Sequence, residues 1–269
     1  MRALPALLLL SASLAAGPAA AAEPSPSVVR WQGEIVRVDG LLRAGAWAGA
    51  REGAAALVEE LLSDLKGGPE GARLLATAYA QRALAEAGVE AREDALWSLR
   101  IAACLDPLFA AAPLDPFGDA GRRLDAWRRA EPDLEAGPRA GALSLDTPDL
   151  EPPAVLEAPT IVFRASAEVL WAFDPALAVE LVIGADGRPR APAVRGSLDN
   201  PSPVAASLET LRRWRFAPAR LAGEPVPVLL TLDLPLTRGA ADRAREALEA
   251  RRGPSEPAPA PSPVPAPEP

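Results

Sequence analysis

One continuous pattern near the C-terminal end of the chain restricts the fold more than any other feature. In residues 177–183 the apolar side chains alternate with other residues, which predicts a half-buried strand. Asp186-Gly187 then suits a tight two-residue turn, because both residues tolerate positive φ angles. Residues 191–197 are the expected return strand. Pro192 places this strand at a sheet edge, because proline has no N–H for strand pairing.

The same pattern continues into a helix and a last strand. Val204, Leu208 and Leu211 form one apolar stripe at helical spacing. Residues 214–218 then leave the helix in an extended path. After a turn at 223–225, every even-numbered residue from 226 to 236 is apolar, which predicts a long final strand. The whole segment is therefore predicted to be a ββαβ unit.

Three runs of residues in this unit carry a family resemblance: IGADGRPRAPAVRGS, SLETLRRWRFAPARLAGEPVPVLLTLDLPL and above all Trp214-Arg215-Phe216-Ala217-Pro218-Ala219. Together they resemble the C-terminal domain of TonB-type energy transducers, over less than a third of the 269 residues. The resemblance implies that Trp214 packs between helix and sheet, and that the domain binds an outer-membrane transporter. The family's tyrosine-proline helix opening has no counterpart around residues 163–173.

The N-terminal half has the periodicity of helical hairpins. Residues 28–66 predict a helix pair broken near Gly45, residues 71–107 predict a second pair, and residues 117–130 predict a capping helix. The second pair resembles a tetratricopeptide repeat in the spacing of Ala95, Leu99, Ala102 and Pro107. The alternatives are a groove that binds a peptide and a bundle that only packs. Four tryptophans in the helical stripes are expected in the core: Trp31, Trp47, Trp97 and Trp127.

The chain is thus predicted to be an α+β protein with two domains. Residues 28–130 form the all-α, tetratricopeptide-like helical-hairpin domain, and residues 158–238 form the ββαβ, TonB-C-like domain. Residues 131–157 are acidic and rich in proline, so we expect an extended linker that only tethers the two domains. Residues 239–269 are expected to be a charged helix followed by a proline-rich tail.

The first 22 residues have the composition of a secretory signal peptide. Arg2 is their one charge, and an apolar core and an alanine run precede Glu23. We expect cleavage near Ala22 and a periplasmic protein. The alternative is an uncleaved membrane anchor. This segment is rich in alanine and contains two prolines, so it should insert into a membrane less favourably than a typical membrane helix.

Composition excludes several kinds of chemistry. The chain has no histidine and one cysteine, Cys104, so Ser-His-Asp and Cys-His catalysis and an intrachain disulfide are excluded. The commonest ligand of catalytic zinc is missing as well. The net charge of −8 disfavours nucleic acid as a partner. We therefore expect a protein without catalytic residues, metal, cofactor or small-molecule substrate, which is not an enzyme.

Two sets of residues are candidates for partner binding. If the even-numbered residues of the last strand pair inward, its outer edge has N–H donors only at Leu229, Thr231 and Asp233, with a proline at each end. Such an edge accepts a short extended peptide by β-augmentation, although the prolines alternatively serve only against aggregation. The second set is a basic cluster that we expect to face an acidic partner, with helix-end stabilisation as the alternative: Arg212, Arg213, Arg215 and Arg220.

These features predict a non-enzymatic periplasmic adaptor that binds an extended segment of an envelope partner, linked to TonB-dependent outer-membrane transport. The alternative is an energy-transducing protein anchored by an uncleaved N-terminal helix. Family transducers carry a histidine in that helix, which this chain lacks. The spacer of about 25 residues is also too short to cross a periplasm at roughly 3.1 Å per residue.

Overall fold

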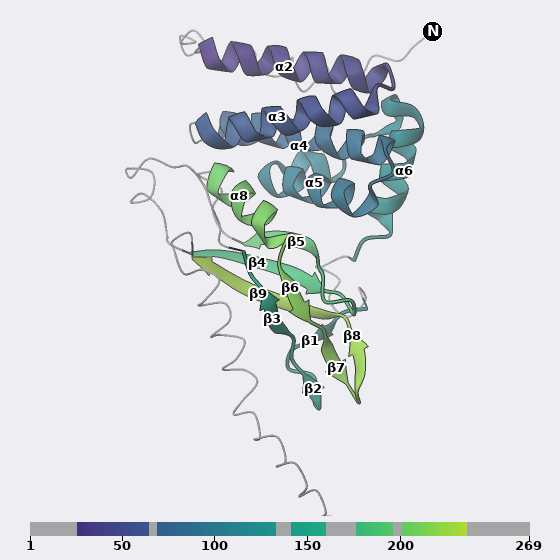
Figure 1. Cartoon of the computed structure of the whole chain (residues 1–269), viewed down its shortest axis with the longest axis vertical. Helices are drawn as coiled ribbons and strands as arrows, with labels where there is room; N and C mark the ends of the chain where they lie inside the picture. The colour runs from purple at the N-terminus through teal and green to yellow at the C-terminus, as the bar shows by residue number, and fades with distance from the viewer. Residues whose placement is uncertain (1–25, 65–68, 133–140, 160–175, 196–200, 236–269) are drawn as a thin grey trace, which may run out of the picture.

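A computed structural model of the chain describes residues 26–64, 69–132, 141–159, 176–195 and 201–235. In these ranges the helices α2 to α6 form a stack, and helix α8 lies between this stack and the strands (Figure 1). The predicted α+β class is confirmed. The leader at 1–22, the family's missing helix opening around 163–173 and the segment 239–269 lie outside the described residues. None of the described helices is long and apolar enough to cross a membrane.

The helical part contains two helix pairs and a further helix, as predicted. Their bounds are α2 (Pro26–Arg43), α3 (Trp47–Asp64), α4 (Pro69–Gly88), α5 (Arg92–Leu105) and α6 (Gly118–Arg129), with 3-10 turns η1 (Pro107–Ala110) and η2 (Asp115–Phe117) before α6. The predicted break near Gly45 is confirmed: this residue has φ +71°, a left-handed conformation that favours glycine. Consecutive helices contact one another, and α6 packs on α4 and α5.

Small and aromatic side chains fill the spaces between the helices. Ala50, Ala54 and Leu57 of α3 are buried, as are Ala95, Leu99 and Ala102 of α5. Small residues at these positions let the helices approach closely. Trp31 and Trp97 are buried in the core, whereas Trp47 and Trp127 are half-buried and pack against its margin. The expected core position is thus confirmed fully for two of the four tryptophans.

The largest sheet has the strand order β1-β9-β4-β5. Its strands are β1 (Leu143–Ser144), β4 (Ala176–Ile183), β5 (Pro189–Arg195) and β9 (Val228–Pro235). β4 pairs antiparallel with β5 and β9, and β1 pairs parallel with β9. The predicted edge position of the strand that contains Pro192 is confirmed, because β5 ends the sheet. Helix α8 (Pro201–Leu211) follows β5, so the predicted order of strand, turn, strand, helix and strand is also confirmed.

The turn between β4 and β5 is longer than predicted. Gly184 N–H donates to Arg188 O at 2.9 Å, so the loop comprises residues 185–187 instead of the two residues Asp186-Gly187. Gly187 has φ +74°, and a Cβ at this position would lie 2.0 Å from Phe216 O. Phe216 N–H in turn donates to Gly187 O at 3.0 Å. Glycine is required here by both the backbone angle and the close approach of another strand.

Two smaller sheets extend from the main sheet. One has the order β2-β7-β8, with β2 (Leu150–Glu151), β7 (Ala219–Leu221) and β8 (Glu224–Val226). The other pairs β3 (Ala154–Glu157) with β6 (Arg215–Ala217). The predicted long last strand is therefore divided at Pro227, since β8 pairs with β7 before it and β9 pairs with β4 after it.

The structure corrects the interpretation of residues 131–157 as a tether for the part from 141 onward, while residues 133–140 lie outside the described residues. Residues 143–157 contain β1, β2 and β3, which pair with strands of the last third of the chain. The helical and β parts also share one hydrophobic cluster, to which Leu75 and Ile101 belong on one side and Leu181 and Leu208 on the other. Helix α8 contacts α3, α4 and α5. The two parts therefore pack against each other and are not separated by a solvated linker.

Candidate functional site

The direction of the backbone groups along β9 defines which side of this strand faces outward. Leu143 N–H of β1 donates to Pro227 O at 2.9 Å. In an extended strand the N–H and C=O of one residue point to the same side, and those of the next residue point to the opposite side. The odd-numbered residues of β9 therefore direct their backbone groups toward β1, and the even-numbered residues direct theirs toward β4. The parity predicted from the sequence agrees with this arrangement.

The three predicted edge residues differ in their surroundings. Leu229 is opposite Ser144 of β1, so its backbone faces a strand of the same chain. Thr231 and Asp233 lie beyond the end of β1, and both side chains are exposed. Within the described ranges, no strand pairs with these two residues on the side away from β4. The predicted window of three donors is thus reduced to two.

Strand β9 has one face of buried apolar side chains and one polar face. Leu230 and Leu232 are buried opposite Leu181 and Val179 of β4, which fixes the strand by apolar contact across the ladder. On the other face, Thr231 is opposite Glu180, whose carboxylate accepts from the Arg195 guanidinium at 2.8 Å. A segment pairing with β9 would therefore meet a strand that is anchored by buried side chains and has a polar outer face.

The predicted basic cluster does not form one surface. Arg212 makes an ion pair with Asp94 of α5, so its guanidinium faces the helical part and not a partner. Arg215 donates to Arg212 O and Trp214 O, at 3.3 and 2.8 Å. Arg220 lies in a different sheet and donates to Gly223 O at 2.6 Å, while Arg213 is exposed. The expectation that all four face an acidic partner is therefore wrong for Arg212.

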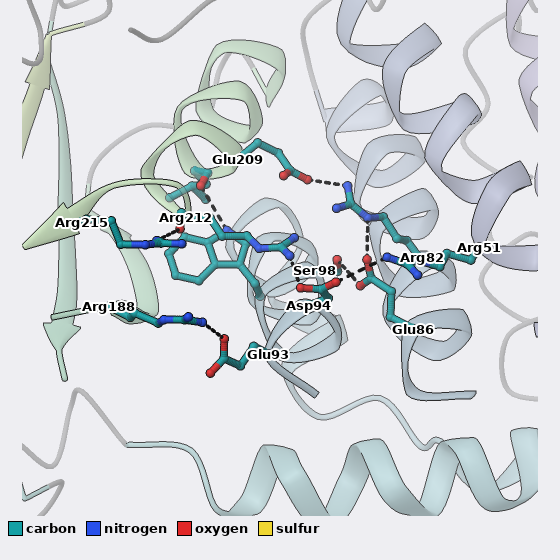
Figure 2. A network of polar contacts seen from close by, with 12 residues as sticks. Arg51, Arg82, Glu86, Glu93, Asp94, Ser98, Arg188, Glu209, Arg212 and Arg215 are labelled. Atoms are coloured by element: carbon teal, nitrogen blue, oxygen red, sulfur yellow. Dashed lines mark hydrogen bonds and ion pairs between the residues drawn. The ribbon is translucent and has the colours of Figure 1, made fainter. Parts of the chain in front are cut away.

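A buried polar network joins α8 to the helical stack. Arg82 of α4 makes ion pairs with Glu209 of α8 at 2.6 Å and with Glu86 at 3.0 Å (Figure 2). Ser98 Oγ donates to the Glu86 carboxylate at 2.7 Å. Burial raises the pKa of Glu86, although Arg82 and the hydrogen bond from Ser98 oppose this shift. Glu86, a residue that is 1% exposed, therefore holds Arg82 in place, and Arg82 in turn pairs with Glu209 of α8.

A second polar contact joins the first turn of α5 to the β part. Glu93 accepts from Arg188 of the β4–β5 turn at 2.7 Å, and Asp94 pairs with Arg212 at the end of α8 (Figure 2). Arg51 of α3 also approaches Asp94, at 3.5 Å. Both carboxylates also lie in the first turn of α5, where the positive end of the helix favours negative charge. Their partners are too distant along the chain for any local pattern to reveal them.

Nothing in the described part of the chain brings together three or more cysteine, aspartate or glutamate residues in a way that suits a metal ion. Comparison with protein-family models, with curated proteins and with solved structures gave no match to the chain.

Proposed function

We propose that this protein is a non-enzymatic adaptor of the bacterial cell envelope, which binds an extended segment of an envelope partner along the outer edge of β9. In this proposal the β part is a TonB C-terminal-like domain, and the helical part is a tetratricopeptide-like domain. The observation that carries the proposal is the open stretch at Thr231 and Asp233, where β1 ends and β9 continues.

The number of free backbone groups predicts a modest affinity for the partner. Two outward residues offer at most four backbone hydrogen bonds, worth about 0.5–1.5 kcal/mol each, or roughly 2–6 kcal/mol in total. A Kd of about 1 μM requires about 8 kcal/mol. Side-chain contacts, for example with the polar face around Glu180 and Asp233, must supply the difference. A partner that binds and leaves readily suits such an edge.

The location and the partner follow from the sequence features. The leader at 1–22 supports export to the periplasm with cleavage near Ala22, and the family resemblance supports an outer-membrane transporter as the partner. N-terminal sequencing of the protein isolated from cells tests this location. A start near Glu23 agrees with the adaptor, whereas an intact N-terminus favours the alternative, an anchored energy transducer.

The binding edge is tested by removing one outward N–H. Thr231→Pro deletes the N–H that faces away from β4, and Thr231→Ala is the matched control that keeps it. The probes are synthetic peptides from the periplasm-facing segments of outer-membrane transporters, with binding measured by fluorescence anisotropy. We expect Thr231→Ala to bind as the parent does and Thr231→Pro to lose binding while its melting temperature stays close to that of the parent.

Two results would contradict this assignment. If Thr231→Pro binds the same peptide as well as the parent, the partner pairs elsewhere. If the variant unfolds, the N–H of Thr231 is needed within the sheet and the parity of β9 is wrong. Asp233→Pro provides a second test, because its N–H points to the same side.

A further inference from the structure

A cavity of about 380 Å³ lies where the helical and β parts meet, away from the edge of β9. Residues 92–100 of α5, the start of β5 and the segment after α8 contribute to its walls. Its lining is unusually rich in one kind of side chain, since it includes Arg92, Arg100, Arg188, Arg190, Arg212 and Arg215. A volume of roughly 300–1,000 Å³ is typical of small-molecule sites.

The positive charge of this cavity is only partly balanced by the protein. Two of the lining carboxylates, Glu93 and Asp94, are engaged by Arg188 and Arg212. Figure 2 shows Arg188 and Arg212 extending from the β part toward these two residues. Glu131 is the remaining lining carboxylate, so arginines are in clear excess over acidic groups around the cavity.

Three of the arginines have no carboxylate within ion-pair distance among the described residues: Arg92, Arg100 and Arg215. Arg100 donates to Pro132 O at 3.3 Å, and within the described ranges Arg215 donates only to main-chain oxygens. Arg190 makes an ion pair with Asp186 at 2.9 Å, outside the cavity lining. Guanidinium groups that lack a carboxylate partner retain donors for an anion.

Glu131 faces these arginines without pairing with them. Its carboxylate makes no ion pair with any described arginine, although Arg100, Arg190 and Arg92 are close enough to lower its pKa. Burial outweighs their attraction and raises the pKa of Glu131. An anion in the space between this carboxyl group and the guanidinium groups would therefore supply the arginines with the negative charge that Glu131 does not supply.

We propose that this cavity binds a small anion bearing carboxylate or phosphate groups, with Arg92 and Arg100 of α5 as its principal donors and Arg190 and Arg215 of the β part facing them. Arginine suits this role because its planar fork forms two parallel hydrogen bonds with either group. The bound anion would contact both parts of the protein, so it would also stabilise their packing. This site is distinct from the partner edge at Thr231 and Asp233.

Calorimetric titration of the full chain tests the proposal with two probes, inorganic phosphate and citrate, against sodium chloride at matched ionic strength. We expect one or both probes to bind and chloride to give no binding heat. Binding of phosphate alone assigns a phosphate-bearing ligand, and binding of citrate alone assigns a carboxylate ligand. A chain that binds neither probe, or that responds to chloride equally, overturns the proposal.

Three variants locate the binding in the cavity. Arg92→Gln removes an exposed donor and should weaken binding about tenfold, as expected for one charge-assisted hydrogen bond. Glu131→Gln removes the competing carboxylate and should tighten binding. The control is Arg122→Gln, an equal loss of charge on α6 outside the cavity, which should leave the affinity unchanged.

Equal weakening by Arg92→Gln and Arg122→Gln would show general charge attraction and overturn the site. Arg100→Gln repeats the test at the second principal donor. The melting temperature of each variant shows whether it is folded. Peptide binding at β9 should be unchanged in Arg92→Gln, which separates the two proposals.

Discussion

The indole Nε1 of Trp97 in α5 donates a hydrogen bond to the main-chain O of Leu208 in α8, at 3.1 Å and in a buried position. The two residues are 111 positions apart in the chain. Leu208 O also accepts from Arg212 N–H at 3.1 Å, so this carbonyl serves both the end of α8 and the helical stack. The contact shows directly that the helical and β parts are packed as one structure.

Trp97→Phe tests the strength of this contact. The bond to Leu208 O is lost, while Arg212 N–H still satisfies that carbonyl, and the smaller phenyl ring leaves part of the buried indole volume empty. We therefore expect the free energy of unfolding to fall by more than the roughly 0.5–1.5 kcal/mol of one hydrogen bond, because the cavity adds to that loss. Urea denaturation measures it. Trp127→Phe on α6 is the control, since its ring is half-buried away from α8, and a larger loss there would contradict the assignment.

Trp214→Ala should be among the most damaging substitutions in the β part. Trp214 is 0% exposed, its ring centroid is 6.1 Å from that of Phe216, and its Nε1 donates to Pro159 O at 3.3 Å. Removing the ring should cost about 3–5 kcal/mol. Two domains joined only by a tether, as predicted from the sequence, would leave the helical part unaffected. The shared core predicts instead one unfolding transition, seen at the same urea concentration by far-UV circular dichroism and by tryptophan fluorescence.

Gly187→Ala and Gly223→Ala separate two costs of replacing glycine. Both positions have positive φ angles, +74° and +85°, which cost a residue with a Cβ about 1–2 kcal/mol. Of these two positions, only Gly187 would bring the new Cβ against backbone, at 2.0 Å from Phe216 O, whereas no atom of the described residues lies within 4 Å at Gly223. We expect Gly187→Ala to be clearly the more destabilising in thermal melts. Equal losses would mean that the hairpin moves away from β6 without cost.

The raised pKa of Glu86 predicts how stability changes with pH. When burial raises the pKa of a carboxyl group, the folded state holds its proton at pH values where the unfolded state has released it. Raising the pH above the ordinary value of 4.5 therefore favours unfolding, until Glu86 also ionises in the folded protein. Glu86→Gln should reduce this decline in the unfolding free energy, measured by urea denaturation at a series of pH values. Glu131 has a shift of the same sign, so Glu131→Gln should remove a further share. An unchanged slope in Glu86→Gln would contradict the prediction.

Local patterns were sufficient to predict the helices and the order β4, β5, α8 and β9. Alternation in 177–183 and the stripe of Val204, Leu208 and Leu211 each arise within a few residues, because they follow the periods of strand and helix. The left-handed glycine at 187 was also predictable from its turn dipeptide. The exact loop length was not, because the approach of Phe216 that fixes Gly187 comes from another strand.

There is a physical reason why the strands between residues 143 and 157 were not predictable from the sequence. β1 and β2 have two residues each, too few to show alternation, and they exist because β9 and β7 offer them unpaired backbone groups. The segment that contains them, residues 131–157, is also acidic and rich in proline, which is the composition of a solvated linker. For the same reason no local pattern indicates that β1 covers Leu229. The parity of the candidate edge was predictable because proline positions reveal it, but its length depends on where β1 ends.

The pairing of β9 with β4 has a mechanical consequence for the proposed adaptor. Eight residue pairs connect the two strands, and antiparallel hydrogen bonds run perpendicular to the strand direction. A partner strand lying along Thr231 and Asp233 would pull nearly parallel to β9. A load along the strand would then act in shear on the β9–β4 pairs together and on the partner's own bonds to β9. A pull away from the sheet would instead open the partner's bonds to β9 one at a time. The edge would thus resist traction along the strand and release its partner by peeling.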